Sequence, residues 1–184
     1  MKDVFKMMLA QQKNQELSQV LNCNSQTGQF GLTLTQKEAL RLMEARREAL
    51  AAAKRVEFGQ GILPDLIYAF CDSPYLQQDS YAETLEELQD IFYQYKNEFL
   101  DQITDSELLE FMRVQFDEVC RGDLDYLAET CLERFSRAVR SGYVTRAQKQ
   151  ARDEYRLGTA DNEYQQFDEE ERWAYELYKM KTLE

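Results

Sequence analysis

Carboxylates are the side chains in this sequence with the greatest capacity for chemistry, and many of them lie one helical turn apart. The pairs are Glu83/Glu87, Glu86/Asp90 and Glu107/Glu110. General acid–base catalysis requires a carboxylate whose pKa is raised in a cleft, and spacing alone does not show this. At such density, paired carboxylates are typical of solvated helix faces. We therefore assign no catalytic residue.

The sequence contains no histidine. This excludes Ser-His and Cys-His nucleophilic pairs and every metal site that needs an imidazole ligand. It also excludes the usual form of a di-iron bundle, which uses Glu-x-x-His. Gly59 and Gly61 form no phosphate-binding motif and indicate a turn. We expect a protein that is not an enzyme and that has no cofactor and no metal ion.

The four cysteines are Cys23, Cys71, Cys120 and Cys131, and no two of them form a C-x-x-C pair. They are too few for a disulfide scaffold and lack the close paired spacing of structural zinc ligands. Free cysteines are commonly buried. We predict reduced, buried thiols, with a zinc site built from cysteines as the alternative.

Two sets of residues are candidates for binding. Asp72, Tyr75 and Tyr93 belong to an aromatic-rich stretch that is mostly core, and these three could line a groove for a peptide or a small ligand. Arg134, Arg137 and Arg140 recur every three residues and could contact an anion, although a solvated or salt-bridged row is the more common explanation.

The elements that position these residues are predicted to be helices. Only two prolines and seven glycines interrupt 184 residues, too few turn residues for an all-β fold. Ser/Thr-x-x-Glu capping boxes begin at Thr35, Ser80 and Thr104, and Asp123 is a further N-cap. We predict an all-α fold of six to eight helices in an irregular bundle with a helical C-terminal extension.

The strongest helical pattern runs from Tyr81 to Phe99, where apolar residues alternate at spacings of four and three. This stripe is either a core seam or a dimer seam, so a homodimer is one possible assembly. Asp3–Asn22 could be one helix or two, and the helix after Thr35 is predicted to continue to about Phe58. We divide the chain into a main domain, 1–142, and an extension, 143–184.

Charge is unevenly distributed along the chain. Of the formal net charge of −12, residues 72–133 carry seventeen Asp/Glu and three Lys/Arg, whereas residues 134–160 carry seven Lys/Arg and two Asp/Glu. Three interpretations remain open: the basic segment shields the acidic helices, the acidic face serves solubility, or it binds a basic partner. Direct nucleic-acid binding is not expected, since phosphates require cations.

The chain has no apolar run of about 18 residues that could span a membrane. Its first residues, Met1–Ala10, are too short an apolar stretch for a signal peptide. We expect a cytoplasmic protein with no membrane partner.

Several local sequences carry a resemblance to a known family. They are Phe58-Gly59-Gln60-Gly61-Ile62-Leu63, Tyr68-Ala69-Phe70-Cys71-Asp72-Ser73-Pro74-Tyr75, Tyr81-Ala82-Glu83-Thr84-Leu85 and Ile91-Phe92-Tyr93. Over about residues 30–140 the chain resembles a family of small helical proteins of unknown function from anaerobic Gram-positive bacteria. The resemblance implies a bacterial cytoplasmic protein and carries no activity or site residues.

Charge segregation, surplus aromatic residues and missing catalytic motifs together indicate a protein–protein interaction or regulatory module. The alternative is a helical protein that binds a small ligand or metal through carboxylates, aromatic residues or cysteines.

Overall fold

A computed structural model describes residues 2–57, 61–100 and 102–142. Within these ranges the chain forms helices and no strand, which confirms the all-α prediction. The main helices are α1 (Lys2–Asn22), α3 (Gln36–Ala52), α4 (Leu63–Phe70), α5 (Tyr81–Glu98), α6 (Asp105–Glu118) and α8 (Glu133–Arg140). The shorter turns are α2 (Asn24–Thr27), η1 (Gly28–Phe30), η2 (Gln78–Ser80) and α7 (Leu124–Tyr126). The predicted extension, 143–184, lies outside the described residues, so the domain division stays a prediction.

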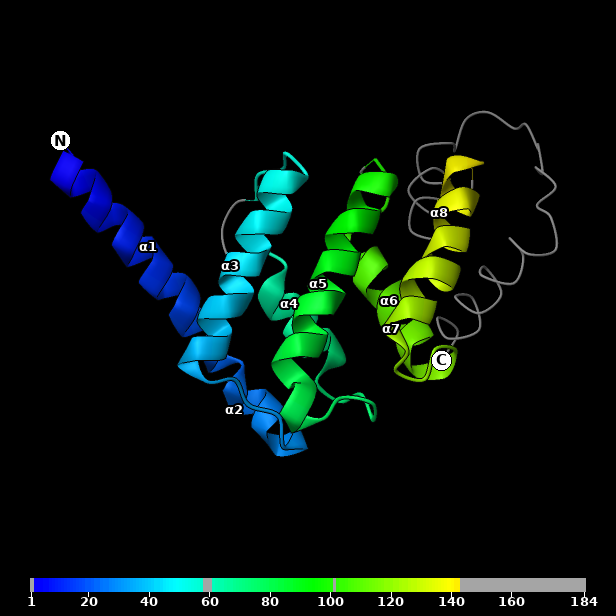
Figure 1. The fold of residues 1–184 in the computed structure, drawn as a ribbon, viewed down its shortest axis with the longest axis horizontal. Coiled ribbons are helices and arrows are strands. Elements are labelled where there is room, and N and C mark those ends of the chain that lie inside the picture. The colour runs from blue at the N-terminus through cyan, green and yellow to red at the C-terminus, as the bar shows by residue number, and fades with distance from the viewer. Residues whose placement is uncertain (1, 58–60, 101, 143–184) are drawn as a thin grey trace, which may run out of the picture.

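Helix α5 is the centre of the bundle, because it packs against α3, α4 and α6. In Figure 1, α3 and α5 stand side by side. The stripe from Tyr81 to Phe99 is buried inside the chain: Leu85 and Leu88 are fully covered, and Tyr81, Phe92 and Phe99 are each 1% exposed. The stripe is therefore a core seam of the single chain.

Aromatic rings continue this core toward α6 and α8. Phe135 of α8 stacks on Phe111 of α6 with ring centroids 3.9 Å apart, and it meets Phe99, directly after α5, edge-on at 5.2 Å. The ring of Phe135 therefore joins α8 to α6 and to the end of α5.

Two of the three capping boxes are present. The Thr35 and Thr104 hydroxyls accept the backbone N–H of Glu38 and Glu107, and each glutamate accepts the N–H of its threonine. Asp123 likewise accepts the N–H of Tyr126. The predicted box at Ser80 is absent, because a 3₁₀ turn, η2, runs directly into α5 and Ser80 makes no capping bond.

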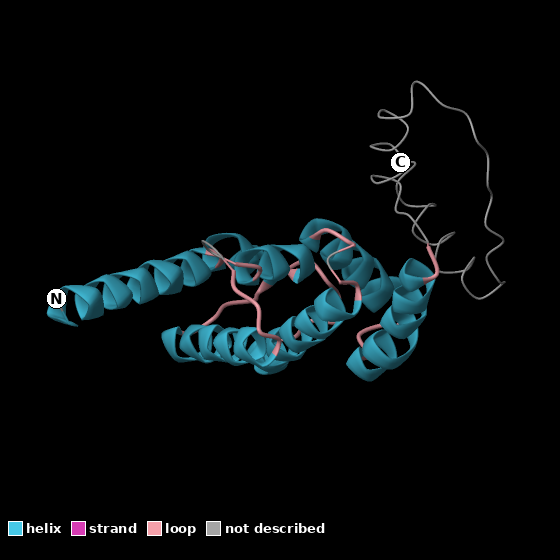
Figure 2. Ribbon diagram, turned by 90° about the horizontal axis from the view of Figure 1, so that it is seen from above, coloured by secondary structure: helices cyan, strands magenta, loops and turns pink. Residues whose placement is uncertain are grey.

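Of the one or two helices expected over Asp3–Asn22, the structure has one: α1 is continuous, and Figure 2 shows its N-terminal half extending beyond the other helices. Other boundaries differ from the prediction. Helix α3 ends at Ala52, several residues before Phe58, and Lys54 after it has a φ of +54°. Between α7 and α8, residues Leu127–Leu132 form a π-helical turn that no sequence pattern predicts.

Side-chain amides hold the extended segment between η1 and α3. Asn24 donates to the Leu34 carbonyl and accepts its N–H, both at 2.8 Å, and Gln78 makes the same pair of bonds with Thr33. These bonds replace the ladder of a neighbouring strand, so the segment is ordered without a sheet.

No helix among the described residues has the length and apolarity that crossing a membrane requires.

Candidate functional site

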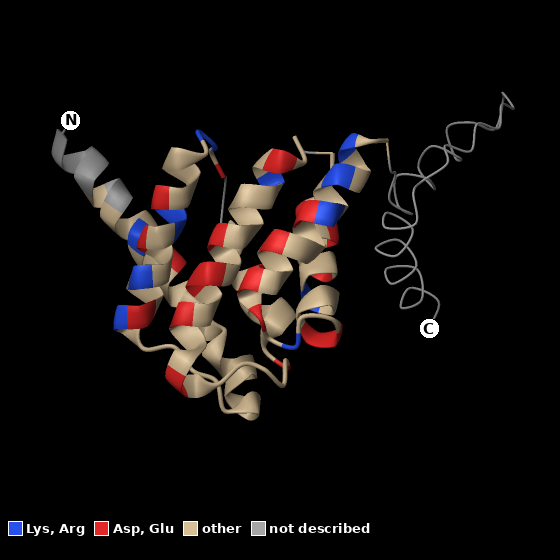
Figure 3. Ribbon diagram, turned by 45° about the vertical axis from the view of Figure 1, so that its right-hand side comes forward, with Lys and Arg blue, Asp and Glu red and all other residues tan. Residues whose placement is uncertain are grey.

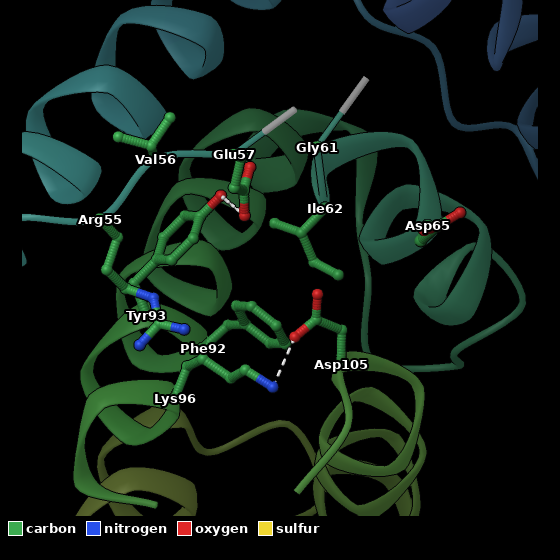
Figure 4. A pocket seen from close by; sticks show the side chains of 10 residues that line it. All are labelled: Arg55, Val56, Glu57, Gly61, Ile62, Asp65, Phe92, Tyr93, Lys96 and Asp105. Carbon is green, nitrogen blue, oxygen red and sulfur yellow. Dashed lines mark hydrogen bonds and ion pairs between the residues drawn. The ribbon is translucent and has the colours of Figure 1, made fainter. Parts of the chain in front are cut away.

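Two hollows in the surface gather polar and aromatic side chains. We call the first the polar cavity, of 580 Å³ (Figure 4). It is lined by Arg55, Val56, Glu57, Gly61, Ile62, Asp65, Phe92, Tyr93, Lys96 and Asp105. We call the second the aromatic groove, of 510 Å³. It is lined by Gln29, Phe30, Tyr68, Ala69, Cys71, Asp72, Arg113, Val114 and Asp117.

One wall of the polar cavity is a partly buried network centred on Glu57. The Arg46 Nε donates to one carboxylate oxygen at 2.8 Å, and the Tyr93 hydroxyl donates to the other at 2.8 Å. Burial, and next the negative charge of Glu57, raise the pKa of Tyr93 far above its ordinary value. The phenol therefore stays protonated and ties the segment after α3 to α5.

The opposite wall is made by Lys96 and Asp105. The Lys96 ammonium is 2.7 Å from the Asp105 carboxylate and also donates to the Ile103 carbonyl, so it joins α5 to the first turn of α6. Figure 4 shows Ile62 and Phe92 between these walls. The cavity thus combines both signs of charge with an apolar floor, which suits a small polar ligand.

The aromatic groove is built around Arg113 of α6. Its Nε donates to the Ala69 carbonyl at 2.7 Å, its Nη2 lies 2.8 Å from Asp72, and its Nη1 pairs with Asp117. The hydrogen bond from Arg113 lowers the pKa of Asp72 below its ordinary value. Ser73 donates to Asp117 at 2.6 Å, which fixes the loop after α4 against α6.

Three aromatic side chains stand exposed around this network. Phe30 is 46% exposed, and Tyr68 and Tyr75 are each 39% exposed. Phe30 and Tyr68 line the groove, and Tyr75 stands beside it with its ring edge-on to buried Phe116. The groove therefore combines exposed aromatic rings with the ion pairs that Arg113 makes.

The structure separates the residues that the sequence grouped as one groove. Asp72 lines the aromatic groove with Tyr75 beside it, whereas Tyr93 is only 3% exposed and lines the polar cavity. Tyr93 is buried although it lies off the apolar stripe, because α5 is covered on several sides.

The arginine row on α8 is at least partly salt-bridged. Arg137 pairs with Glu133 one turn earlier at 3.2 Å, and Arg140 reaches Glu98 at the end of α5 at 3.3 Å. Arg134 is half-buried, and its charge acts on the neighbouring Cys131 thiol. These contacts do not bring the row to either hollow.

Part of the acidic middle of the chain is neutralised internally. Arg41 of α3 contacts both Glu83 and Glu86 of α5, at 3.0 and 2.9 Å. Figure 3 shows acidic residues along α5 and the helices that follow it, with basic residues on α3 and α8. Most of the basic segment 134–156 lies outside the described residues, so shielding by that segment stays a prediction.

Three cysteines are buried, as predicted, and Cys71 is partly exposed. Sequence reasoning missed that Cys120 and Cys131 touch, with sulfur atoms 3.5 Å apart. It also missed Arg113, Phe30 and Tyr68 as neighbours of Asp72 in the groove. Arg113 is one of three cations among residues 72–133, and this isolation was a signal that could have singled it out.

These features define an all-helical domain with an aromatic core, a polar cavity and an exposed aromatic groove. The chain belongs to the family of unknown function DUF6323, whose model matches residues 19–145. The match confirms membership of a family of unknown function, and the bacterial source implied by the resemblance stays an expectation. No curated protein and no solved structure matches the chain.

Proposed function

We propose that this protein is a non-enzymatic interaction or regulatory module that binds a partner protein at the aromatic groove. One observation carries the proposal: Phe30, Tyr68 and Tyr75 are exposed around the ordered network of Arg113. Aromatic residues and arginine are enriched at interface centres because they bury large areas at low entropic cost. Exposed aromatic clusters also incur a hydration cost that a partner removes.

The charge of the groove favours a basic partner. Arg113 is paired with both Asp72 and Asp117, so the three groups carry one net negative charge. The Asp72 side chain is 59% exposed and retains room to accept further hydrogen bonds. A lysine or arginine next to an apolar anchor would satisfy both the carboxylate and the rings.

The wider acidic region supports the same partner. The pairs that Arg41 makes with Glu83 and Glu86 leave a large excess of carboxylates in residues 72–133. Such an excess steers a basic surface toward the protein before short-range contacts form. We expect this binding in the cytoplasm, without direct contact to nucleic acid.

A comparison of partner capture by matched variants tests the proposal. The full chain and a Phe30→Ser/Tyr68→Ser variant are used to capture partners from the native host, with crosslinking to map the contact. Leu100→Ser is the control, because Leu100 is 74% exposed, lies in the turn just after α5 and is absent from the groove lining. We expect the groove variant to lose the partner and the control to keep it.

Two further measurements are the dependence of affinity on ionic strength and the molecular mass in solution. The affinity for the captured partner should fall as ionic strength rises, because exposed charges are screened. Crosslinks outside the groove, or affinity that is insensitive to salt, would contradict the proposed surface. Light scattering separates self-association from binding of another protein.

The second candidate function, binding of a small polar ligand, is favoured by the polar cavity. Arg55, Lys96, Glu57 and Asp105 place both signs of charge around Ile62 and Phe92. Thermal shift measurements with small carboxylates and zwitterions test it. We expect the thermal shift caused by a bound compound to be lost in Arg55→Met. It should be retained in Lys54→Met, because the Lys54 side chain is exposed and absent from the cavity lining.

A further inference from the structure

The contact between Cys120 and Cys131 belongs to neither hollow and has its own chemistry. Their sulfur atoms lie 3.5 Å apart, and a disulfide needs about 2.05 Å. The remaining approach is small for two side chains that already face each other. The other two thiols instead contact backbone carbonyls: Cys23 that of Gln19, and Cys71 that of Tyr68.

Both cysteines lie on irregular backbone. Cys120 follows the end of α6 and precedes Arg121 and Gly122, whose φ values are +53° and +89°. Cys131 lies in the π-helical turn Leu127–Leu132. Neither residue is within a regular α-helical ladder, so either can shift by about an ångström without breaking one.

The two sulfur atoms have different surroundings. Cys131 is fully buried, whereas Cys120 is 7% exposed and offers the approach from solvent. The hydrogen bond between the two thiols, and next the charge of Arg134, lower the pKa of the Cys131 thiol, while the same bond raises the pKa of Cys120. Cys131 thus acts as the proton acceptor of the pair, and oxidation begins at Cys120, the residue with the greater exposure.

We propose that Cys120 and Cys131 form a redox-active dithiol that hydroperoxides convert to an intramolecular disulfide. The pair first loses one proton to solvent, which leaves the thiolate on Cys131, and Cys120 then passes its own proton to Cys131 as the Cys120 sulfur attacks the peroxide oxygen. The O–O bond breaks, Cys120 becomes a sulfenic acid, and the leaving alkoxide or hydroxide takes a proton from solvent to give an alcohol or water. The Cys131 sulfur then attacks the Cys120 sulfur, the S–O bond breaks, and water leaves with the Cys131 proton. In total two thiols and one hydroperoxide give one disulfide, one alcohol (water for hydrogen peroxide) and one water.

Oxidation of the native full chain by hydrogen peroxide tests this. After alkylation and tryptic digestion, cleavage at Arg113, Arg121 and Arg134 places the cysteines on separate peptides, 114–121 and 122–134. We expect these peptides to be joined with the loss of two hydrogen atoms, reversibly with a dithiol reductant and without loss of helical circular dichroism. Cys23 and Cys71 should remain alkylated.

Cys71 provides a sharp contrast, because it is the most exposed of the four thiols. Burial, and next the charge of Asp72, raise its pKa. Its sulfur contacts the Tyr68 carbonyl and not a second thiol that could accept its proton or close a disulfide, so exposure alone does not make it reactive. Cys71→Ser should leave the crosslink intact. Cys131→Ser should abolish it and slow the oxidation of Cys120, because the variant lacks both the proton acceptor and the thiol that closes the disulfide.

Three outcomes would overturn the proposal. The first is a crosslink that forms only after denaturation. The second is pairing of Cys120 with another cysteine. The third is oxidation of Cys71 while Cys120 and Cys131 stay reduced in the folded protein.

Discussion

The guanidinium of Arg46 lies directly against the backbone of Gly61, where a Cβ would stand 2.1 Å from Nη2. Arg46 belongs to α3 and is 7% exposed, and Gly61 precedes α4 with a φ of +64°. The glycine therefore leaves the space in which Arg46 reaches Glu57. One backbone position thus permits the buried ion pair that forms a wall of the polar cavity.

Gly61→Ala is expected to destabilise the protein by at least about 1 kcal/mol, because an L-residue is strained at this φ and its Cβ displaces Arg46. Urea denaturation measures the effect. Gly28→Ala is the matched control, since Gly28 has a φ of −59° and no atom within 4 Å of the point where an added Cβ would stand. Equal losses in the two variants would contradict the packing of Arg46 on Gly61.

Arg46→Met should lower the free energy of unfolding by about 2 to 3 kcal/mol, because it leaves the half-buried Glu57 carboxylate without its cation. The double variant Arg46→Met/Glu57→Gln should be more stable than Arg46→Met alone, since the uncompensated charge is removed. Chemical denaturation of these two proteins, Glu57→Gln and the unchanged chain gives the coupling energy. Additive losses would show that the pair contributes no interaction of its own.

Thr104→Ala and Ser80→Ala test the two kinds of predicted cap. Thr104→Ala should cost about 1 kcal/mol, because the hydroxyl accepts the N–H of Glu107. Ser80→Ala should change stability by less than about 0.5 kcal/mol, as expected for a surface side chain without a capping bond. Thermal or urea denaturation compares them, and a large loss in Ser80→Ala would show that its hydroxyl does cap α5.

Asp90 and Asp72 should respond to pH in opposite directions. Burial, and next the charges of Glu86, Glu87 and Glu48, raise the pKa of Asp90 in the folded protein. Its favourable contribution is therefore present below the ordinary carboxylate pKa and is lost as pH rises through the raised value. Asp90→Asn should stabilise the protein at neutral pH, with the gain disappearing in acid.

Asp72 is held by Arg113, and its folded pKa is lowered. Its contribution is present above the ordinary carboxylate pKa and is lost as pH falls through the lowered value. Asp72→Asn should therefore cost less than about 1 kcal/mol at neutral pH, as expected for an exposed pair, and nothing in strong acid. Denaturation midpoints across pH check both variants, and shifts of the same sign would contradict the assignment.

Local sequence patterns predicted the parts of the fold that local bonding determines. The caps at Thr35, Thr104 and Asp123 require only residues within one helical turn, and all three are present. The pattern at Ser80 satisfied the same rule but failed, because the preceding η2 turn brings the chain into α5 from another direction. A capping motif gives no information about the path of the chain before it.

Tertiary partners could not be predicted in the same way. Tyr93 lies off the heptad stripe of α5, and its burial depends on Glu57 from the segment after α3. Arg113 and Asp72 meet across 41 positions of the chain. Periodicity identifies one apolar face, whereas a central helix such as α5 is covered on further faces that only the fold determines.

The π-helical turn sets the helical phase of the α8 residues that follow it. In an α-helix each residue turns about 100°, so Leu127 and Val139 would differ in direction by roughly a third of a turn. Both are nevertheless buried, with Cys131 and Phe135 between them at intervals of four residues. The wider π turn absorbs this drift and keeps the four side chains on one face. The extra residue held in this turn is therefore needed for the core: if 127–132 closed into a regular α-helix without losing a residue, Phe135 would rotate away from Phe111 by about 100°.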